Sequence, residues 1–396
     1  MAAAMEIVEA LGQQVERSWL ATGYDEGAFP GIAAEALEKA GLHAKIEPLD
    51  IIRWAVTTRQ APAQVDPSSR FGQPPLTLFS SRLFYIGVLF WLDDTTTIHD
   101  HRFSGAFQVL AGGSLHAPHT FSVGRSLGSF KTGELATGRM EHLKPGDVRA
   151  ILPGDRFIHS LFHLERPSVT LIVRTRNAPT AAQFTYFRPG IALDTYLADE
   201  WAMKLDQIAQ LCAELGPAIA IATLDELLAE ADPRTCFLAL RTGLKLPDPR
   251  EFERLLDRAA SRFEAPFHQC FRELKRITFL IGRRAHVREP EHRFFLALLM
   301  NAPNRTALVE GAAAFCADAP PEFTIARWVG ELERVKPRPR DGEAQMSNVL
   351  GLPNADDECL AAFRDHLLGQ GPPGGSRGAA FVAALERVAA LQPLFR

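Results

Sequence analysis

Residues 97–113 read TIHDHRFSGAFQVLAGG, and this short run decides the fold. Its two histidines, His99 and His101, are separated by a single residue. On a β-strand, residues two apart point to the same face, so both imidazoles can point into one barrel. Neutral imidazole is the commonest metal ligand in proteins. The run therefore predicts a strand that supplies two ligands of a metal site.

A third ligand has to come from another strand, and residues 144–163, KPGDVRAILPGDRFIHSLFH, provide it. Two Pro-Gly pairs in this segment predict turns. The second turn leads into a β-rich run that places His159 near the start of a strand. Although a lone His-x-His is weak evidence, both segments together predict a metal site formed by His99, His101 and His159.

These two segments resemble the two motifs of the cupin superfamily, and the similarity is closest to the cysteine dioxygenase-like branch. The matching pattern is His-x-His, then a small residue or cysteine, then a glycine. It falls here on His99, His101, Ala106 and Gly113. The resemblance covers roughly residues 76–180. It implies a small antiparallel β-barrel and an Fe(II) site for oxygen chemistry.

The chain departs from the family pattern at two positions. Many cupins have a glutamate ligand where this chain has Ala106, and cysteine dioxygenases often have a crosslinked cysteine there. Ile172 stands where those enzymes use a histidine that hydrogen-bonds a tyrosine near the metal. We therefore expect a site of three histidines without a carboxylate, and cysteine itself does not follow as the substrate.

Neighbouring residues should line the pocket beside this site. If Ala106 faces the metal, strand alternation turns Gln108 and Leu110 the same way. His163 shares the parity of His159 and would hold a ligand or a bound water. The resemblance also implies an arginine for a substrate carboxylate. The candidate catalytic residues are Gln108, His163, Tyr85 and Arg82.

Each candidate also has a purely structural interpretation. Gln108 and His163 are equally consistent with packing inside the barrel, and Arg82 with an ion pair at its rim. His116 and His119 follow a turn, so we expect them to be exposed to solvent. Asp100 alternates with the ligands, as does Arg102, so both should face outward. Three further histidines, His268, His286 and His292, lie in helical sequence and are predicted to be structural.

The regions around the barrel are predicted to be helical, which makes the fold class α+β. Apolar residues recur at helical spacing near the N-terminus, as in Ile7, Leu11 and Val15, and again from Trp201 onward. We expect N-terminal helices over residues 1–60 that pack on the barrel. A cupin-type antiparallel β-barrel that holds the metal should span 61–193. An all-helical domain of unknown role should span 194–396.

Composition excludes several kinds of partner. The net charge is −4, so there is no overall positive charge to attract nucleic acid, and we expect no nucleic-acid partner. The longest apolar run, residues 83–92, is too short to span a bilayer, so no membrane partner is expected. Five cysteines without a CxxC pair favour a reducing, cytoplasmic location.

These observations predict an Fe(II)-dependent three-histidine cupin oxygenase. It would add oxygen from dioxygen to a small-molecule or amino-acid-derived substrate, a thiol being one candidate. Three neutral imidazoles leave up to three metal positions open for substrate and dioxygen. Zinc or another divalent metal is the alternative cofactor, which would make the chain a hydrolase or isomerase. A further alternative is a non-catalytic cupin that binds metal or a small molecule and acts through its helical domain. That domain could also mediate a homodimer or bind a protein partner.

Overall fold

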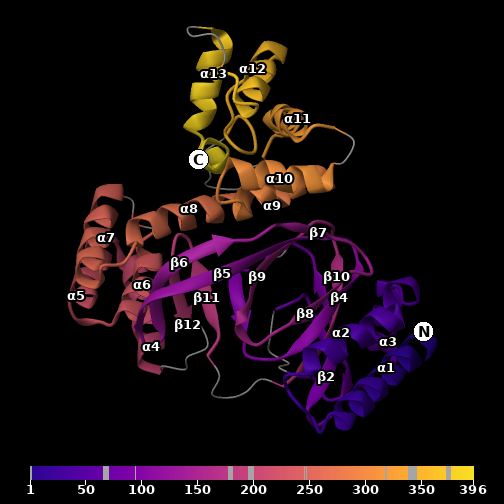
Figure 1. Cartoon of the computed structure of the whole chain (residues 1–396). Helices are drawn as coiled ribbons and strands as arrows, with labels where there is room; N and C mark the ends of the chain where they lie inside the picture. The colour runs from indigo at the N-terminus through magenta and orange to yellow at the C-terminus, as the bar shows by residue number, and fades with distance from the viewer. Residues whose placement is uncertain are drawn as a thin grey trace.

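The computed structural model describes residues 2–65, 71–93, 95–176, 182–194, 200–244, 246, 248–316, 319–337, 346–371 and 376–396. A β-structure lies between two groups of helices (Figure 1). The first group consists of α1 (Ala2–Ala21), α2 (Phe29–Ala40), η1 (Leu42–Ala44) and α3 (Pro48–Thr57). The fold is therefore α+β, as predicted.

Twelve strands follow in the described residues: β1 (Pro75–Ser80), β2 (Phe84–Trp91), β3 (Ile98–His101), β4 (Gly105–Ala111), β5 (Ser114–Leu127), β6 (Phe130–Thr137), β7 (Glu141–Leu143), β8 (Val148–Ile151), β9 (Gly154–His163), β10 (Ser168–Thr175), β11 (Phe184–Phe187) and β12 (Ile191–Asp194). One sheet has the order β1-β2-β10-β4-β8, and the other β6-β12-β11-β3-β9-β5-β7. The strand pairings are antiparallel. Strand β6 also pairs with β5. Buried side chains of both sheets, such as Phe107 of β4 and Leu161 of β9, form one apolar cluster between them. The two sheets together make a closed antiparallel barrel.

Strand alternation divides the barrel side chains between an inner and an outer face. Apolar side chains such as Phe107, Val109 and Ile172 form a small cluster inside. Their sequence neighbours on β4 and β10, including Ala106 and Leu171, belong to a different cluster, shared with α1 and α2. The N-terminal helices thus cover the outer face of the five-stranded sheet, burying apolar surface on both of its sides.

The second group of helices covers the other sheet. It consists of α4 (Glu200–Leu215), α5 (Pro217–Glu230), α6 (Pro233–Gly243), α7 (Pro249–Phe263), α8 (Phe267–Arg283), η2 (Arg284–His286), α9 (Pro290–Asn301), α10 (Arg305–Phe315), α11 (Pro321–Glu333), α12 (Asp357–Leu367), α13 (Arg377–Glu386) and η3 (Ala389–Phe395). Phe130 and Leu193 of the barrel pack with the first helices of this group. Leu115 and Phe162 pack with the later helices. The helical region therefore packs on the barrel through two separate hydrophobic clusters.

Local signals explain several helix starts in this region. Asp232 caps α6 by accepting hydrogen bonds from the backbone N–H groups of Arg234 and Thr235.

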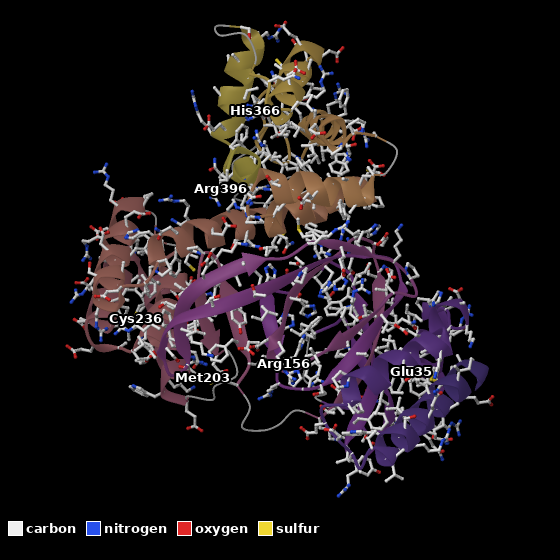
Figure 2. All side chains as sticks on the ribbon, in the orientation of Figure 1. Glu35, Arg156, Met203, Cys236, His366 and Arg396 are labelled. Atoms are coloured by element: carbon white, nitrogen blue, oxygen red, sulfur yellow. The ribbon has the colours of Figure 1, made fainter. Side chains whose placement is uncertain are left out.

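Cys236 follows on the same helix (Figure 2), and its thiol is buried and forms no disulfide, as is also true of Cys270 and Cys359. No single described helix is long and apolar enough to cross a bilayer; only the bent pair α13 and η3 meets that test together.

Candidate metal centre

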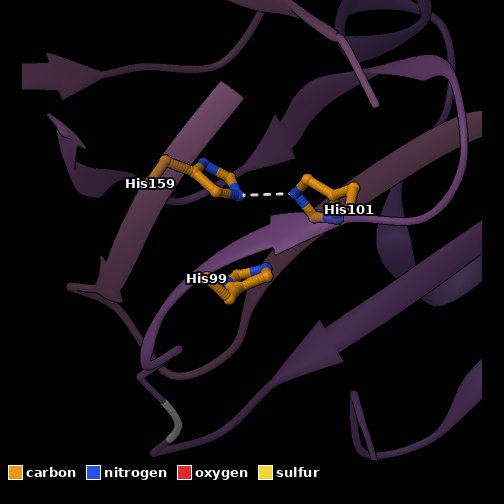
Figure 3. A group of neighbouring side chains, drawn as sticks. All are labelled: His99, His101 and His159. Carbon is orange, nitrogen blue, oxygen red and sulfur yellow. Dashed lines mark hydrogen bonds between the residues drawn. The ribbon is translucent and has the colours of Figure 1, made fainter. Parts of the chain in front are cut away.

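The three predicted ligands converge inside the barrel. His99 and His101 come from β3 and His159 from β9, and the strand register sets His99 directly opposite His159. One nitrogen from each ring lies within 4.8 Å of the corresponding atoms of the others. Figure 3 shows the closest approach, 2.9 Å between His101 Nε2 and His159 Nε2. We call these residues the three-histidine cluster.

Burial keeps the imidazoles of this cluster uncharged. Their side chains are between 2% and 7% exposed. Desolvation is the main cause that lowers the pKa of each, and for His101 and His159 the neighbouring histidines lower the pKa further. An uncharged imidazole has a nitrogen lone pair to offer. This donor set therefore fits a divalent metal that accepts neutral nitrogen ligands.

A backbone contact fixes the orientation of one histidine of the cluster. The Nδ1–H of His99 donates to the carbonyl oxygen of Thr97 at 2.7 Å. Because a carbonyl only accepts, the proton must be on Nδ1, and Nε2 keeps its lone pair. A hydrogen bond of this type on the second ring nitrogen is the usual way in which a protein orients a metal-binding histidine.

A cavity of about 500 Å³ opens beside the cluster. His99 and His101 form part of its wall, and Phe103 and Ile172 contribute apolar surface. Arg174 also lines it, with its guanidinium carbon 3.3 Å from the centre of the Phe103 ring. The cavity is large enough for a small organic molecule. Such a molecule would lie against two of the three histidines.

The predicted pocket residues on β2 and the preceding turn have different positions. Tyr85 lines the cavity as predicted and lies opposite Arg174 in the β2–β10 register. Arg82 is exposed in the turn before β2 and is not among the described residues that line the cavity. Arg174 takes the position in the cavity wall that the sequence predicted for Arg82. Only the pairing of two distant strands reveals this.

The expected inward orientation of Ala106, Gln108 and Leu110 is wrong. The odd-numbered residues stay inside from His101 through Phe103 to Phe107 and Val109. Ala106 and Leu110 consequently pack beneath the N-terminal helices. The Gln108 amide donates to the carbonyl oxygens of Leu37 and Gly146 at 3.4 and 3.3 Å. Gln108 therefore links the sheet to α2 and is not among the described residues of the cavity wall.

This alternation also explains the absence of a carboxylate ligand on β4. Position 106 points away from the cluster. A Cβ atom at Gly105 would lie 2.2 Å from the carbonyl oxygen of Val173, so no side chain fits there. Phe107 is the inward residue, and its ring centre lies 6.2 Å from that of His159. The three-histidine cluster thus has the aromatic ring of Phe107 on its β4 side.

His163 points inward like His159 but belongs to a different environment. Its ring stacks on Trp91 with ring centres 4.3 Å apart, and its Nδ1 lies 2.8 Å from Ser114 Oγ. Burial is the main cause that lowers its pKa, with Arg284 and Arg293 contributing. It is neither in the three-histidine cluster nor among the described residues of the cavity wall. These contacts identify a packing position.

His116 and His119 are buried, at 3% and 5% exposure, so the prediction of solvent exposure is wrong. The reason is the length of β5, whose first half pairs with both β7 and β9. His116 points inward, and its ring centre is 5.2 Å from that of His159. The alternation in residues 114–117, SLHA, is the sequence signal that could have indicated a strand here.

Asp100 faces away from the cluster, as predicted for a residue between two ligands. Its carboxylate accepts hydrogen bonds from the Phe184 backbone N–H at 2.7 Å and from the Tyr186 hydroxyl at 2.8 Å. Burial raises the pKa of this carboxyl group, and these two hydrogen bonds lower it. Arg102, by contrast, lines the cavity together with His101, so its predicted outward orientation is wrong.

Comparisons with known proteins give likenesses of fold only. No protein-family model matches the chain, and neither does any curated protein sequence. A cupin superfamily protein from Desulfitobacterium hafniense is 15% identical over 26% of this chain and 76% of its own, with a TM-score of 0.19. The DMSP lyase DddQ from Ruegeria pomeroyi is 18% identical over 32% and 57%, with a TM-score of 0.20. Hydroquinone 1,2-dioxygenase PnpCD, solved with Cd²⁺ and 4-hydroxybenzonitrile, is 15% identical over 26% and 63%, with a TM-score of 0.20. The fold and the site of this chain define a closed antiparallel β-barrel with a buried three-histidine cluster.

Proposed function

We propose that this chain is an Fe(II)-dependent three-histidine oxygenase that acts on a small molecule or an amino-acid derivative. The observation that supports this function best is the cluster itself: three uncharged imidazoles converge beside a cavity of about 500 Å³. A neutral donor set leaves the full charge of a divalent metal in place, which favours binding of an anionic substrate atom. A thiol, as a thiolate, is a substrate of that type.

When bound, Fe(II) would supply open coordination positions for a substrate atom and dioxygen, and the electrons that activate dioxygen. The protein side chains hold and shield this reaction space. Thr97 orients His99 through its carbonyl oxygen. Phe103 and Ile172 give the cavity wall apolar surface. We expect the metal to be held by His99, His101 and His159.

Arg174 and Tyr85 are the best candidates for contacting the remote end of the substrate. They face each other across β2 and β10 and both line the cavity. Guanidinium groups bind carboxylates through two parallel hydrogen bonds. An anionic thiol such as a thiol carboxylate is therefore the favoured substrate class. The departures at Ala106 and Ile172 leave cysteine itself unassigned.

Oxygen consumption tests this function directly. The full chain is purified without oxygen, loaded with Fe(II), and mixed with oxygenated buffer and thiol carboxylates, thiol amines or neutral thiols. We expect oxygen uptake with the thiol carboxylates. Arg174→Gln should raise KM for these substrates and leave KM for neutral thiols unchanged. Arg82→Gln removes an exposed arginine that does not line the cavity, so it is the matched control. Iron-loaded protein that consumes no oxygen with any of the three classes contradicts the proposal.

A non-catalytic, metal-dependent sensor is a second candidate, because the ligand-bearing strand is tied to the helical region. Ser160, which follows His159 on β9, donates a 2.8 Å hydrogen bond to Asn301 Oδ1 at the end of α9. A shift of β9 on metal binding would reach α9 through this contact. If metal changes hydrogen exchange in α9 while no substrate drives oxygen uptake, the sensor is favoured.

A further inference from the structure

Two neighbouring buried imidazoles each have a nitrogen without a partner. His159 Nδ1 and His116 Nε2 are both buried and make no hydrogen bond to any residue that the structure describes. Their ring centres are 5.2 Å apart, with ring planes at 72°. A buried polar atom without a partner is costly, and folded proteins rarely leave two side by side. These two nitrogens are therefore candidates to satisfy each other.

The contact with Glu141 determines which ring nitrogen of His116 carries the proton. Its Nδ1 lies 3.2 Å from Glu141 Oε2, which also accepts from Arg149 Nε at 2.9 Å. The hydrogen bond with His116 and the nearby Arg149 lower the pKa of Glu141 to about 2, so this group is a carboxylate. A carboxylate only accepts, so Nδ1 of His116 carries the hydrogen. In the neutral ring, Nε2 then offers a lone pair.

The metal-binding side of His159 determines its tautomer in the same way. Its Nε2 points into the three-histidine cluster and lies 2.9 Å from His101 Nε2. If Nε2 binds the metal, the hydrogen of the neutral ring must be on Nδ1. His159 then presents a buried N–H donor, whereas His116 presents a buried acceptor. The two unpartnered atoms are complementary.

We propose that His116, held by Glu141, is a positioning residue that accepts the Nδ1–H of His159 and so orients this ligand toward the metal. The two nitrogens make no direct hydrogen bond in this structure, so the contact closes on metal binding or passes through one water molecule. The proposal rests on the metal site of the proposed function. This hydrogen bond would orient the His159 ring as the carbonyl oxygen of Thr97 orients the His99 ring. A carboxylate–histidine partner also makes the ligand nitrogen a stronger donor. Glu141, with 42% of its side chain exposed, connects this chain of groups to solvent.

Co(II) binding to the full chain tests the role without substrate or dioxygen. The probe is Co(II) itself, measured by competition with a chelator and by its visible absorption spectrum. His116→Phe keeps a ring of similar size and removes both nitrogens. We expect it to bind one Co(II) per chain, but about 10- to 100-fold more weakly and with a shifted spectrum. His116→Gln returns a polar atom near the Nε2 position and should recover part of the affinity.

His119→Phe is the matched control. His119 is a buried histidine of the same strand, but it contacts Ser160 and Thr137 and not the cluster. Its replacement should leave both Co(II) affinity and spectrum unchanged. Glu141→Gln, which keeps the side chain length, should weaken binding less than His116→Phe and provides a second measurement if His116→Phe fails to fold.

Two results overturn the positioning role. Wild-type affinity and spectrum in His116→Phe would show that His159 needs no such partner. Complete loss of Co(II), as expected for His159→Ala, would make His116 a metal ligand instead. Neither result depends on oxygen uptake. Tight Co(II) binding by a wild-type chain that consumes no oxygen would contradict the proposed function alone.

Discussion

Strand β9 has two buried, inward-facing histidines whose surroundings differ. His159 lies in the three-histidine cluster, whereas His163 stacks on Trp91 and lies beside Ser114. Burial lowers the pKa of both, and each has one buried nitrogen without a partner among the described residues. Neither burial nor an unpartnered nitrogen therefore identifies a ligand. What distinguishes His159 is that nitrogens from two other rings approach it.

The largest expected effect is the loss of metal from His159→Ala. Removing one of three ligands leaves two imidazoles of one strand, which cannot enclose an ion. Metal content per chain, measured after anaerobic loading with Fe(II), should fall from one to near zero. Thermal unfolding should show that the variant still folds. Equal metal content in wild type and variant would show that His159 is not the third ligand.

His163→Ala should have the opposite effect, keeping the metal and losing stability. The substitution removes the ring stacked on Trp91 and leaves a cavity in the barrel core. We expect the free energy of unfolding to drop by about 2–4 kcal/mol. Urea denaturation measures this change, and metal analysis provides the comparison. Loss of metal from this variant, in protein shown to be folded, would place His163 in the metal centre.

The sequence predicted the barrel, its helical flanks and the three-histidine cluster, because strand alternation and Pro-Gly turns are local features. It failed where a residue's surroundings depend on strand pairing. The motif alignment put Ala106 inside, but Phe107 is the residue of β4 that faces inward, and Ala106 packs beneath the N-terminal helices. Arg174 meets Tyr85 only through the β2–β10 register, and Glu141 meets His116 only through the β5–β7 register. No spacing along the chain encodes either contact.

Acid should destabilise the metal-free protein, and His163 should contribute to this effect. Burial lowers the pKa of His163 and His119, and that of His142 to about 4, from the value of 6.5 for a free histidine. The unfolded chain therefore binds more protons below pH 6.5. Stability is lost as the pH falls through 6.5 toward the folded-state pKa. The loss is at most about 1.4 kcal/mol per pH unit for each such histidine.

Urea denaturation of metal-free protein between pH 7.5 and 5.5 measures this slope. His163→Phe removes one titrating group and keeps a ring against Trp91, so its slope should be shallower than that of wild type. His268→Gln, at a half-buried site beside Glu253 and Asp257, replaces a histidine outside the barrel interior and is the control. Stability independent of pH over this range would contradict the assignment of His163 as a buried neutral histidine.

Ser114→Ala should have the smallest effect and tests the contact that distinguishes His163 from His159. It removes the hydrogen bond between Ser114 Oγ and His163 Nδ1, so the unfolding free energy should fall by about 1–2 kcal/mol, with metal binding unchanged. A double-mutant cycle with His163→Phe isolates the pair. In the His163→Phe background the serine hydroxyl has no imidazole nitrogen to bind. Ser114→Ala should therefore lower the unfolding free energy less in that background than in wild type. Strictly additive effects would mean that the hydrogen bond contributes nothing, and stacking on Trp91 alone would then hold His163 in place.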